Sequence, residues 1–326
     1  MRQFEYASPK STQQAVGLLS SNAAILAGGT DLLALMKDDI VTPNRLVNIK
    51  DVGGLDRVGP IADGFSIGAL ARLSDVADNV EVRKLFPMLA MAVDEAASPQ
   101  IRNLATIGGN LCQRPRCWYF RSGFGLLAMK DGKSMVADGD NRNHAIIAND
   151  GPSKFVSPST IAPALIAYGA HVAIVGPKGT RNVPLGDFYR IPKAEGEREQ
   201  DLRPNEMVTE IILPGKMKPT NAAQYEVRQK AAFDWPLSLA SVALWMDGRT
   251  VRKANIVLGA VAPIPWLSKE AAAELQGKPL NRQTIDAASE AAVSIARPLS
   301  KNGYKVQLTR VAVKRALMAA AEGGRA

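Results

Sequence analysis

Apolar runs alternate with amphipathic stretches along the first 50 or so residues of the chain. The runs have the length of buried strands, and the stretches between them repeat apolar positions at helical spacing. Ser11 stands where a helix N-cap is expected, and Pro43 separates the last run from the stretch before it. This order predicts a small α/β unit with strands at 3–6, 23–27 and 45–49 and helices at 11–20 and 30–38.

A second region follows in which apolar runs and amphipathic stretches again alternate, so it is also expected to be α/β. The glycine pair Gly108-Gly109 is expected to form a turn there. Residues 118–158 are rich in Gly, Asp, Asn and Ser, which indicates an irregular insertion. The remaining pattern predicts helices at 74–79, 84–96 and 159–169 and strands at 64–68, 171–175, 181–184 and 207–213.

A change of composition at 215–221 marks the expected domain boundary, because Pro, Gly, Lys and Thr interrupt the apolar pattern there. Beyond it the pattern predicts strands at 225–227, 237–246 and 253–258, a hairpin turn at Asp247-Gly248, and helices at 268–275, 283–296 and 304–322. We therefore expect an α+β fold with two domains. The first covers 1–216, with lobes of about 1–55 and 56–216, and the smaller second domain covers 217–326.

The composition is that of a folded chain with no membrane span. Its 326 residues are 46% hydrophobic, which is enough for a sizeable core. No run of about 18 apolar residues occurs, and the first residues lack the pattern of a signal peptide, so we expect a cytoplasmic location. Cys112 and Cys117 are the only cysteines, which argues against a disulfide scaffold.

The net charge of +9 is mostly spread along the chain. One local excess lies near the C-terminus, at Lys301, Lys305, Arg310, Lys314 and Arg315. It is either a solvated face of a helix or a docking surface for an acidic partner subunit. Since aromatic residues do not interleave with these cations, we expect no binding to nucleic acid.

The stretch Ile25-Leu-Ala-Gly-Gly-Thr-Asp-Leu-Leu33 is an apolar strand that runs into two glycines and the start of a helix. Such a turn can hold phosphate, because consecutive backbone N–H groups at Gly28 and Gly29 can converge on an anion and Thr30 adds a hydroxyl. Glycine is also required by tight turns that bind nothing, so this motif alone leaves both interpretations open.

A second stretch, Gln100 to Asn110, again places a hydroxyl residue, a glycine pair and a small polar side chain close together. Two such turns could hold the two phosphates of a dinucleotide from opposite sides. Neither has the G-x-G-x-x-G spacing of a nicotinamide-binding Rossmann turn, and the chain has no G-x-x-x-x-G-K-[ST] motif for ATP hydrolysis.

Taken together, Leu26-Ala-Gly-Gly-Thr-Asp31 and Thr106-Ile-Gly-Gly-Asn110 resemble the FAD-binding medium subunit of the xanthine dehydrogenase, carbon monoxide dehydrogenase and aldehyde oxidoreductase family of molybdenum hydroxylases. Further matches carry the resemblance over nearly the whole chain: Gln100-Ile-Arg-Asn103, Gly186-Asp-Phe-Tyr189, the Glu206 strand ending at Leu213-Pro214, and Phe233-Asp-Trp-Pro236.

The resemblance implies a two-lobed FAD-binding domain of the PCMH type and a C-terminal domain of the CO dehydrogenase flavoprotein type. It also implies a complex with a large subunit that binds the molybdenum cofactor, a molybdopterin, and a small subunit that carries [2Fe–2S] clusters. The FAD-binding positions carried over are Leu26, Ala27, Gly28, Gly29, Thr30, Asp31, Leu32, Leu33, Thr106, Gly109, Asn110, Thr160 and Val208.

Two departures from the family pattern stand out. Thr160 replaces the usual aspartate, which implies a shorter or water-bridged contact to the ribose side of FAD. The segment from Leu111 to Phe120 resembles the start of a region that holds a [4Fe–4S] cluster in the aldehyde oxidoreductase subgroup, but the later cysteines are missing. Four thiolates are normally needed, so we expect no such cluster on this chain and a free or packed thiol at Cys117.

No catalytic set is visible in the side chains. His144 and His171 are the only histidines, and no Ser/His/Asp set or H-E-x-x-H motif occurs, so we expect no metal site. His144 either touches the flavin ring or caps a turn. Three aromatic residues either stack on flavin, line a subunit interface or fill core and loop contacts: Phe233, Trp235 and Trp266.

We expect the chemistry to come from FAD, which passes electrons from partner [2Fe–2S] clusters to an external acceptor. Two alternatives remain at this point. One is a stand-alone flavin oxidoreductase with its own acid–base residue, and the other is a scaffold subunit that has lost flavin.

Overall fold

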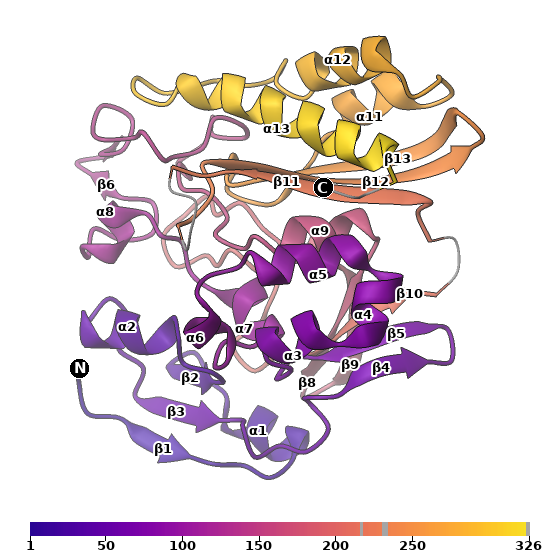
Figure 1. Ribbon diagram of the computed structural model, residues 1–326. Coiled ribbons are helices and arrows are strands. Elements are labelled where there is room, and N and C mark those ends of the chain that lie inside the picture. Colours follow the sequence, from indigo (N-terminus) through magenta and orange to yellow (C-terminus); the bar gives the residue numbers. More distant parts are fainter. Residues whose placement is uncertain (216–217, 230–233, 324–326) are drawn as a thin grey trace.

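The computed structural model describes residues 1–215, 218–229 and 234–323, and arranges their longer strands in three sheets (Figure 1). The strands that form these sheets are β1 (Glu5–Ala7), β2 (Ala23–Leu26), β3 (Arg45–Asn48), β4 (Val58–Ile61), β5 (Gly64–Gly68), β8 (His171–Gly176), β9 (Gly179–Pro184), β10 (Met207–Pro214), β11 (Asn221–Val227), β12 (Ser238–Asp247), β13 (Thr250–Gly259) and β14 (Trp266–Leu267).

The first sheet is parallel, with the strand order β1-β3-β2. Its crossovers contain α1 (Thr12–Leu18) and α2 (Leu32–Lys37). The Ser11 hydroxyl accepts a hydrogen bond from the Gln14 amide, so the predicted N-cap of α1 is confirmed. The glycine segment lies between β2 and α2, where a parallel strand delivers the chain to a helix start.

The second sheet has the order β4-β5-β10-β8-β9 and is antiparallel throughout. Helices α3 (Leu73–Asp78), α4 (Val80–Leu85), α5 (Pro87–Asp94) and α9 (Ala162–Ala167) share its apolar core. The short helices α6 (Pro99–Arg102), α7 (Ile107–Cys112) and α10 (Leu185–Phe188) complete this part of the chain.

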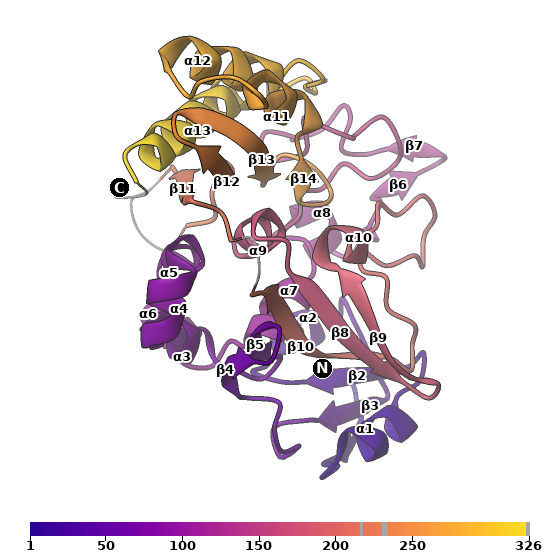
Figure 2. The same ribbon diagram turned by 90° about the vertical axis from the view of Figure 1, so that its right-hand side faces the viewer.

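The third sheet, β11-β12-β13-β14, is antiparallel and packs on both faces. One face carries α11 (Lys269–Leu275), α12 (Arg282–Ala291) and α13 (Tyr304–Ala321), as Figure 1 shows. Ala243 and Val257 on the other face join the core of the second sheet, and Figure 2 places α5 and α9 on that side. This double packing explains why the run at 237–246 is apolar without alternation.

The segment from Gln113 to Pro158, which contains the predicted irregular stretch 118–158, is largely irregular apart from α8 (Trp118–Arg121) and the small hairpin of β6 (Met129–Lys130) and β7 (Lys133–Ser134). Its far end reaches the third sheet. Ile146 and Ile147 are buried in the core of that sheet and its helices, and both amides donate to the Val261 carbonyl. The insertion is therefore a structural link between the second and third sheets.

Two local predictions are wrong. Gly108 and Gly109 do not form a turn but lie in α7, because the Thr106 hydroxyl caps that helix by accepting from the Gly109 amide. The single helix predicted at 84–96 is two helices, α4 and α5, since Phe86 leaves helical geometry and Pro87 begins the next helix.

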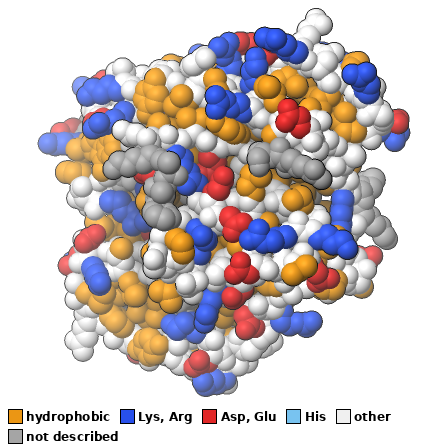
Figure 3. Space-filling model, in the orientation of Figure 1, with side chains coloured by type: hydrophobic (Ala, Val, Ile, Leu, Met, Phe, Trp, Pro, Cys, Tyr) orange, Lys and Arg blue, Asp and Glu red, His pale blue; other side chains and the backbone are white. Residues whose placement is uncertain are grey.

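The basic excess near the C-terminus is mostly paired within the chain. On α13, Arg310 pairs with Glu290 and Lys314 pairs with Asp286 of α12. Arg315 donates to the Tyr225 hydroxyl. On the face in Figure 3, Lys and Arg are interspersed with Asp and Glu. Within the described residues, no helix is both long and apolar enough to cross a membrane.

Candidate functional site

The two glycine segments, far apart in sequence, meet in space. A Cβ atom built at Gly28 would lie 2.0 Å from the Leu104 carbonyl oxygen, so only glycine fits at this point of contact. Gly29 has a φ of +73°, a left-handed conformation that favours glycine. The turn after β2 and the start of α7 therefore form one continuous backbone surface.

The second segment presents a helix start to this surface. Thr106 caps α7 through a hydrogen bond of 3.1 Å between its Oγ1 and the Gly109 amide. The hydroxyl hydrogen of Thr106 remains available for a ligand oxygen, because the cap uses only the lone pair. Asn110 continues the surface, and its Oδ1 accepts from Ser159 Oγ at 2.6 Å.

Asp31 does not present a free carboxylate to this surface. Its Oδ1 pairs with the Arg116 and Arg121 guanidinium groups at 2.8 and 2.7 Å, and its Oδ2 accepts from the Arg114 amide at 2.8 Å. These contacts hold the start of the insertion against the first glycine segment. These arginines were not predicted as site residues, although three of them within eight residues are a sequence signal for an acidic partner.

The other predicted FAD-binding positions differ in how deeply they are buried. Leu26 and Val208 are buried, and Val208 belongs to the core of the second sheet. Leu32 and Leu33 begin α2, and the Leu33 side chain lies 3.0 Å from a Cβ built at Gly29. Ala27 and Thr30 are half-buried. Of these positions, Leu26 and Leu33 lie next to Gly29, and Val208 lies in the core of the second sheet.

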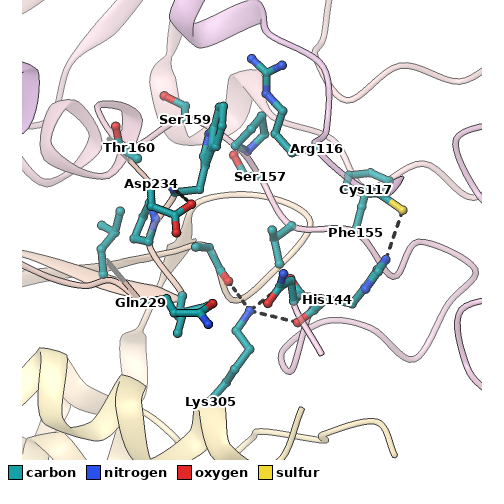
Figure 4. Close-up of a pocket in the computed structure, with 18 of the residues that line it drawn as sticks. Arg116, Cys117, His144, Phe155, Ser157, Ser159, Thr160, Gln229, Asp234 and Lys305 are labelled. Atoms are coloured by element: carbon teal, nitrogen blue, oxygen red, sulfur yellow. Dashed lines mark hydrogen bonds between the residues drawn. The ribbon is translucent and has the colours of Figure 1, made fainter. Parts of the chain in front are cut away.

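A cavity of about 420 Å³ is lined by Thr160 and by Ser159, the residue whose hydroxyl donates to Asn110. This volume falls within the range of roughly 300–1,000 Å³ that small-molecule sites occupy. Its walls come from the insertion and from the C-terminal part of the chain, as Figure 4 shows. Lining residues include Arg116, Cys117, His144, Ser157, Thr160, Gln229, Asp234, Trp235, Ala260 and Lys305.

The wall nearest the insertion carries a thiol and an imidazole in contact. Cys117 Sγ lies 3.1 Å from His144 Nε2, and the ring of Trp118 packs edge-on against the imidazole. Burial and, secondarily, the Lys305 charge lower the pKa of His144 to about 4, while burial raises the pKa of the Cys117 thiol. The pair is therefore neutral at pH 7, which makes Cys117 a packed thiol.

Trp235 closes part of the cavity rim. The Arg116 guanidinium carbon lies 4.7 Å from the centre of the indole ring, in cation–π contact. Trp266 is held in β14 and does not line the cavity. Phe233, the other aromatic position considered in the sequence analysis, lies outside the described residues.

Three buried polar atoms of residues that line the cavity, Arg116 Nε, His144 Nδ1 and Ser157 Oγ, have no hydrogen-bond partner among the described residues. Buried polar groups are normally paired, so these atoms are positioned to bind a ligand with polar edges. The glycine surface suits a pyrophosphate, and the adjoining cavity suits a planar ring with carbonyl and N–H groups. The residues present therefore fit FAD.

The potential metal ligands of the described residues are not clustered. The described part of the chain contains no group of three or more His, Cys, Asp or Glu side chains arranged to hold a metal ion. Cys112 lies away from the cavity wall and is buried enough that its thiol pKa rises to about 11.

Fold and site together define a two-lobed dinucleotide-binding protein with a third, C-terminal sheet. Two families match it: "FAD binding domain in molybdopterin dehydrogenase" over residues 2–216 and "CO dehydrogenase flavoprotein C-terminal domain" over residues 223–320. The chain belongs to the family of FAD-binding medium subunits of molybdenum hydroxylases, which includes those of CO dehydrogenase, aldehyde oxidoreductase and xanthine dehydrogenase.

Individual relatives agree over most of the chain. The aldehyde oxidoreductase FAD-binding subunit PaoB of Escherichia coli strain K12 is 32% identical over 88% of this chain and 88% of its own length. The carbon monoxide dehydrogenase medium chain of Hydrogenophaga pseudoflava is 30% identical over 97% of this chain and 96% of its own length. A solved structure of that organism's carbon monoxide dehydrogenase matches with a TM-score of 0.79 and 29% identity, covering 99% of both chains.

Proposed function

We propose that this chain receives electrons from [2Fe–2S] clusters of a small partner subunit and delivers them through FAD to an external acceptor. The organic substrate is oxidised in a large partner subunit that binds the molybdenum cofactor. The observation that carries the proposal is the contact of Gly28 with Leu104, which joins two anion-binding backbone segments beside a cavity with unpaired polar atoms. FAD supplies the chemistry, because it exchanges electrons singly or in pairs.

The chain's own residues bind and orient the cofactor in this proposal. The backbone amides of Gly28, Gly29 and the start of α7, with the hydroxyls of Thr30 and Thr106, hold the pyrophosphate. Gly109 and Asn110 close over it. Asp31 acts through the arginines of the insertion, which it fixes beside the site.

We further assign the flavin ring to the cavity between the insertion and the C-terminal part. Thr160 lines this cavity, where it would meet the ribose side of FAD, and Val208 lies in the core of the second sheet. We place the division between the FAD-binding domain and the C-terminal domain at 216/217. The ring would therefore be enclosed by both domains and shielded from water.

The stand-alone oxidoreductase is less well supported, because the cavity's imidazole is neutral and packed against Cys117, and the Lys305 amine is occupied by three backbone carbonyls. The scaffold alternative rests on Thr160 alone. A hydroxyl at that position keeps a donor and an acceptor, so it is compatible with bound FAD.

The purified chain should show the visible absorption of a flavin and release FAD on acid treatment. Gly28→Val should abolish FAD binding, because the side chain would occupy the place of the Leu104 carbonyl. Gly17→Ala is the matched control, since Gly17 lies in α1 with open space around it. A colourless chain that cannot be reconstituted with FAD would overturn the proposal.

Electron transfer needs the partner subunits as well. Substrate should bleach the flavin only when the molybdenum and iron–sulfur subunits are present. Bleaching of the isolated chain by an organic substrate would instead support the stand-alone oxidoreductase.

A further inference from the structure

A buried lysine lies at the wall of the cavity. Lys305, in the first turn of α13, is 1% exposed. Its Nζ donates to the carbonyls of Ala260 at 2.6 Å, His144 at 3.0 Å and Asn143 at 3.4 Å. Lys305 and all three acceptor residues line the cavity, and Figure 4 shows the amine directed toward these carbonyls.

Lys305 has no acidic partner. None of the ion pairs among the described residues includes it, and its hydrogen bonds all go to neutral carbonyls. Burying an ammonium group without a counter-anion is costly, and an apolar residue of similar volume would avoid that cost. Negative charge that enters the cavity would offset this cost.

The other charged and titratable groups around this wall do not supply that negative charge. Arg116 and Arg121 line the cavity from the insertion, and His144 and Cys117 form their own neutral contact. Tyr304, the neighbour of Lys305 on α13, donates to the Arg142 carbonyl. Asp234 is the one acidic residue among the lining residues, against the three cations Arg116, Arg121 and Lys305, and its Oδ1 accepts from the Trp235 amide.

We propose that the Lys305 ammonium is the counter-charge for the reduced flavin and thereby raises the reduction potential of the FAD bound in this cavity. This inference rests on the proposed function. Oxidised FAD takes two electrons and one proton to give an anionic reduced flavin, and the lysine keeps its own proton throughout. Positive charge beside the ring stabilises the anion and not the neutral oxidised form.

The test is the FAD midpoint potential of the full-length chain, measured by equilibration with a reference dye at pH 6.5. Lys305→Met should lower the equilibrium constant for two-electron reduction at least tenfold, which corresponds to about 30 mV for a two-electron couple. The difference should shrink toward pH 9, because burial lowers the pKa of Lys305 to about 7 and the amine loses its charge.

Lys314→Met is the matched control. It removes the same charge from the same helix, but Lys314 pairs with Asp286 outside the cavity, so the potential should not change. Lys305→Gln keeps a donor for the carbonyls without the charge and gives the same comparison if the methionine variant does not fold. A potential unchanged in the neutral variants, with FAD bound, would overturn this inference and leave the proposed function standing. Failure of the wild-type chain to bind FAD would overturn both.

Discussion

His144 shows how a single buried side chain makes stability depend on pH. Burial lowers its pKa to about 4, below the ordinary value of 6.5, so the unfolded chain binds a proton more tightly than the folded chain. The contribution of His144 is therefore fully present above pH 6.5 and is lost as the pH falls toward 4, by up to about 1.4 kcal/mol per pH unit.

Urea denaturation between pH 4 and 7 measures this loss. His144→Gln should reduce the pH dependence in this window. His171→Gln should not, since His171 is an exposed residue of β8. Equal slopes for the wild-type chain and His144→Gln would show that another group controls the acid sensitivity.

At the scale of elements, Thr106 joins helix stability to ligand binding. Thr106→Ala removes the N-cap of α7, which should lower the unfolding free energy by about 1 kcal/mol and weaken FAD binding at least tenfold, because the amides of the helix start lose their arrangement. Fluorescence titration with FAD measures the affinity. Ser11→Ala removes the cap of α1 and should destabilise the fold without changing FAD affinity.

The result that would contradict this prediction is an equal affinity for FAD in Thr106→Ala and Ser11→Ala. Thr106→Ser, which keeps the hydroxyl, should retain both the cap and the affinity.

Elements were predictable where local chemistry determines them. Apolar runs gave the positions of β2, β3, β8, β10 and β12, and the Ser11 cap marked the start of α1. The strand β4 was missed because Val58-Gly-Pro-Ile61 has only two apolar side chains and is defined by pairing with β5. The break at Phe86 was missed because Pro87 is itself compatible with a first helical turn.

The candidate site was predictable only in part. The glycine segments were predictable because adjacent glycines next to a hydroxyl residue are visible in the sequence itself. The cavity did not, because its walls join residues from Arg116 to Lys305 that only the tertiary fold brings together. Lys305 in particular looked like one member of a basic helix face, and sequence spacing gave no sign that it is buried.

On the scale of the whole molecule, Asn302 fastens the C-terminal part to the insertion. Its buried amide donates to the His144 and Ala145 carbonyls at 3.2 Å, and its Oδ1 accepts from the Leu299 amide at 2.6 Å. Asn302→Ala leaves these buried groups unpaired, which should cost about 2–3 kcal/mol of unfolding free energy and expose residues 118–158 to proteases.

Limited proteolysis with mass spectrometry locates the cleavage sites. Asn221→Ala is the matched control, because Asn221 donates to the Ala320 carbonyl within the C-terminal part alone. Cleavage of the insertion at the same rate in both variants would show that Asn302 does not secure it.

The cavity is lined by residues that are far apart in the sequence, so it can form only late in translation. Ala260 and Lys305 complete a cavity that begins beside the glycine segments near the N-terminus. During translation, the first two sheets can form while residue 305 is still inside the ribosome, but the cavity is then open on one side. A ligand enclosed by this cavity can therefore be surrounded on all sides only after residue 305 has left the ribosome.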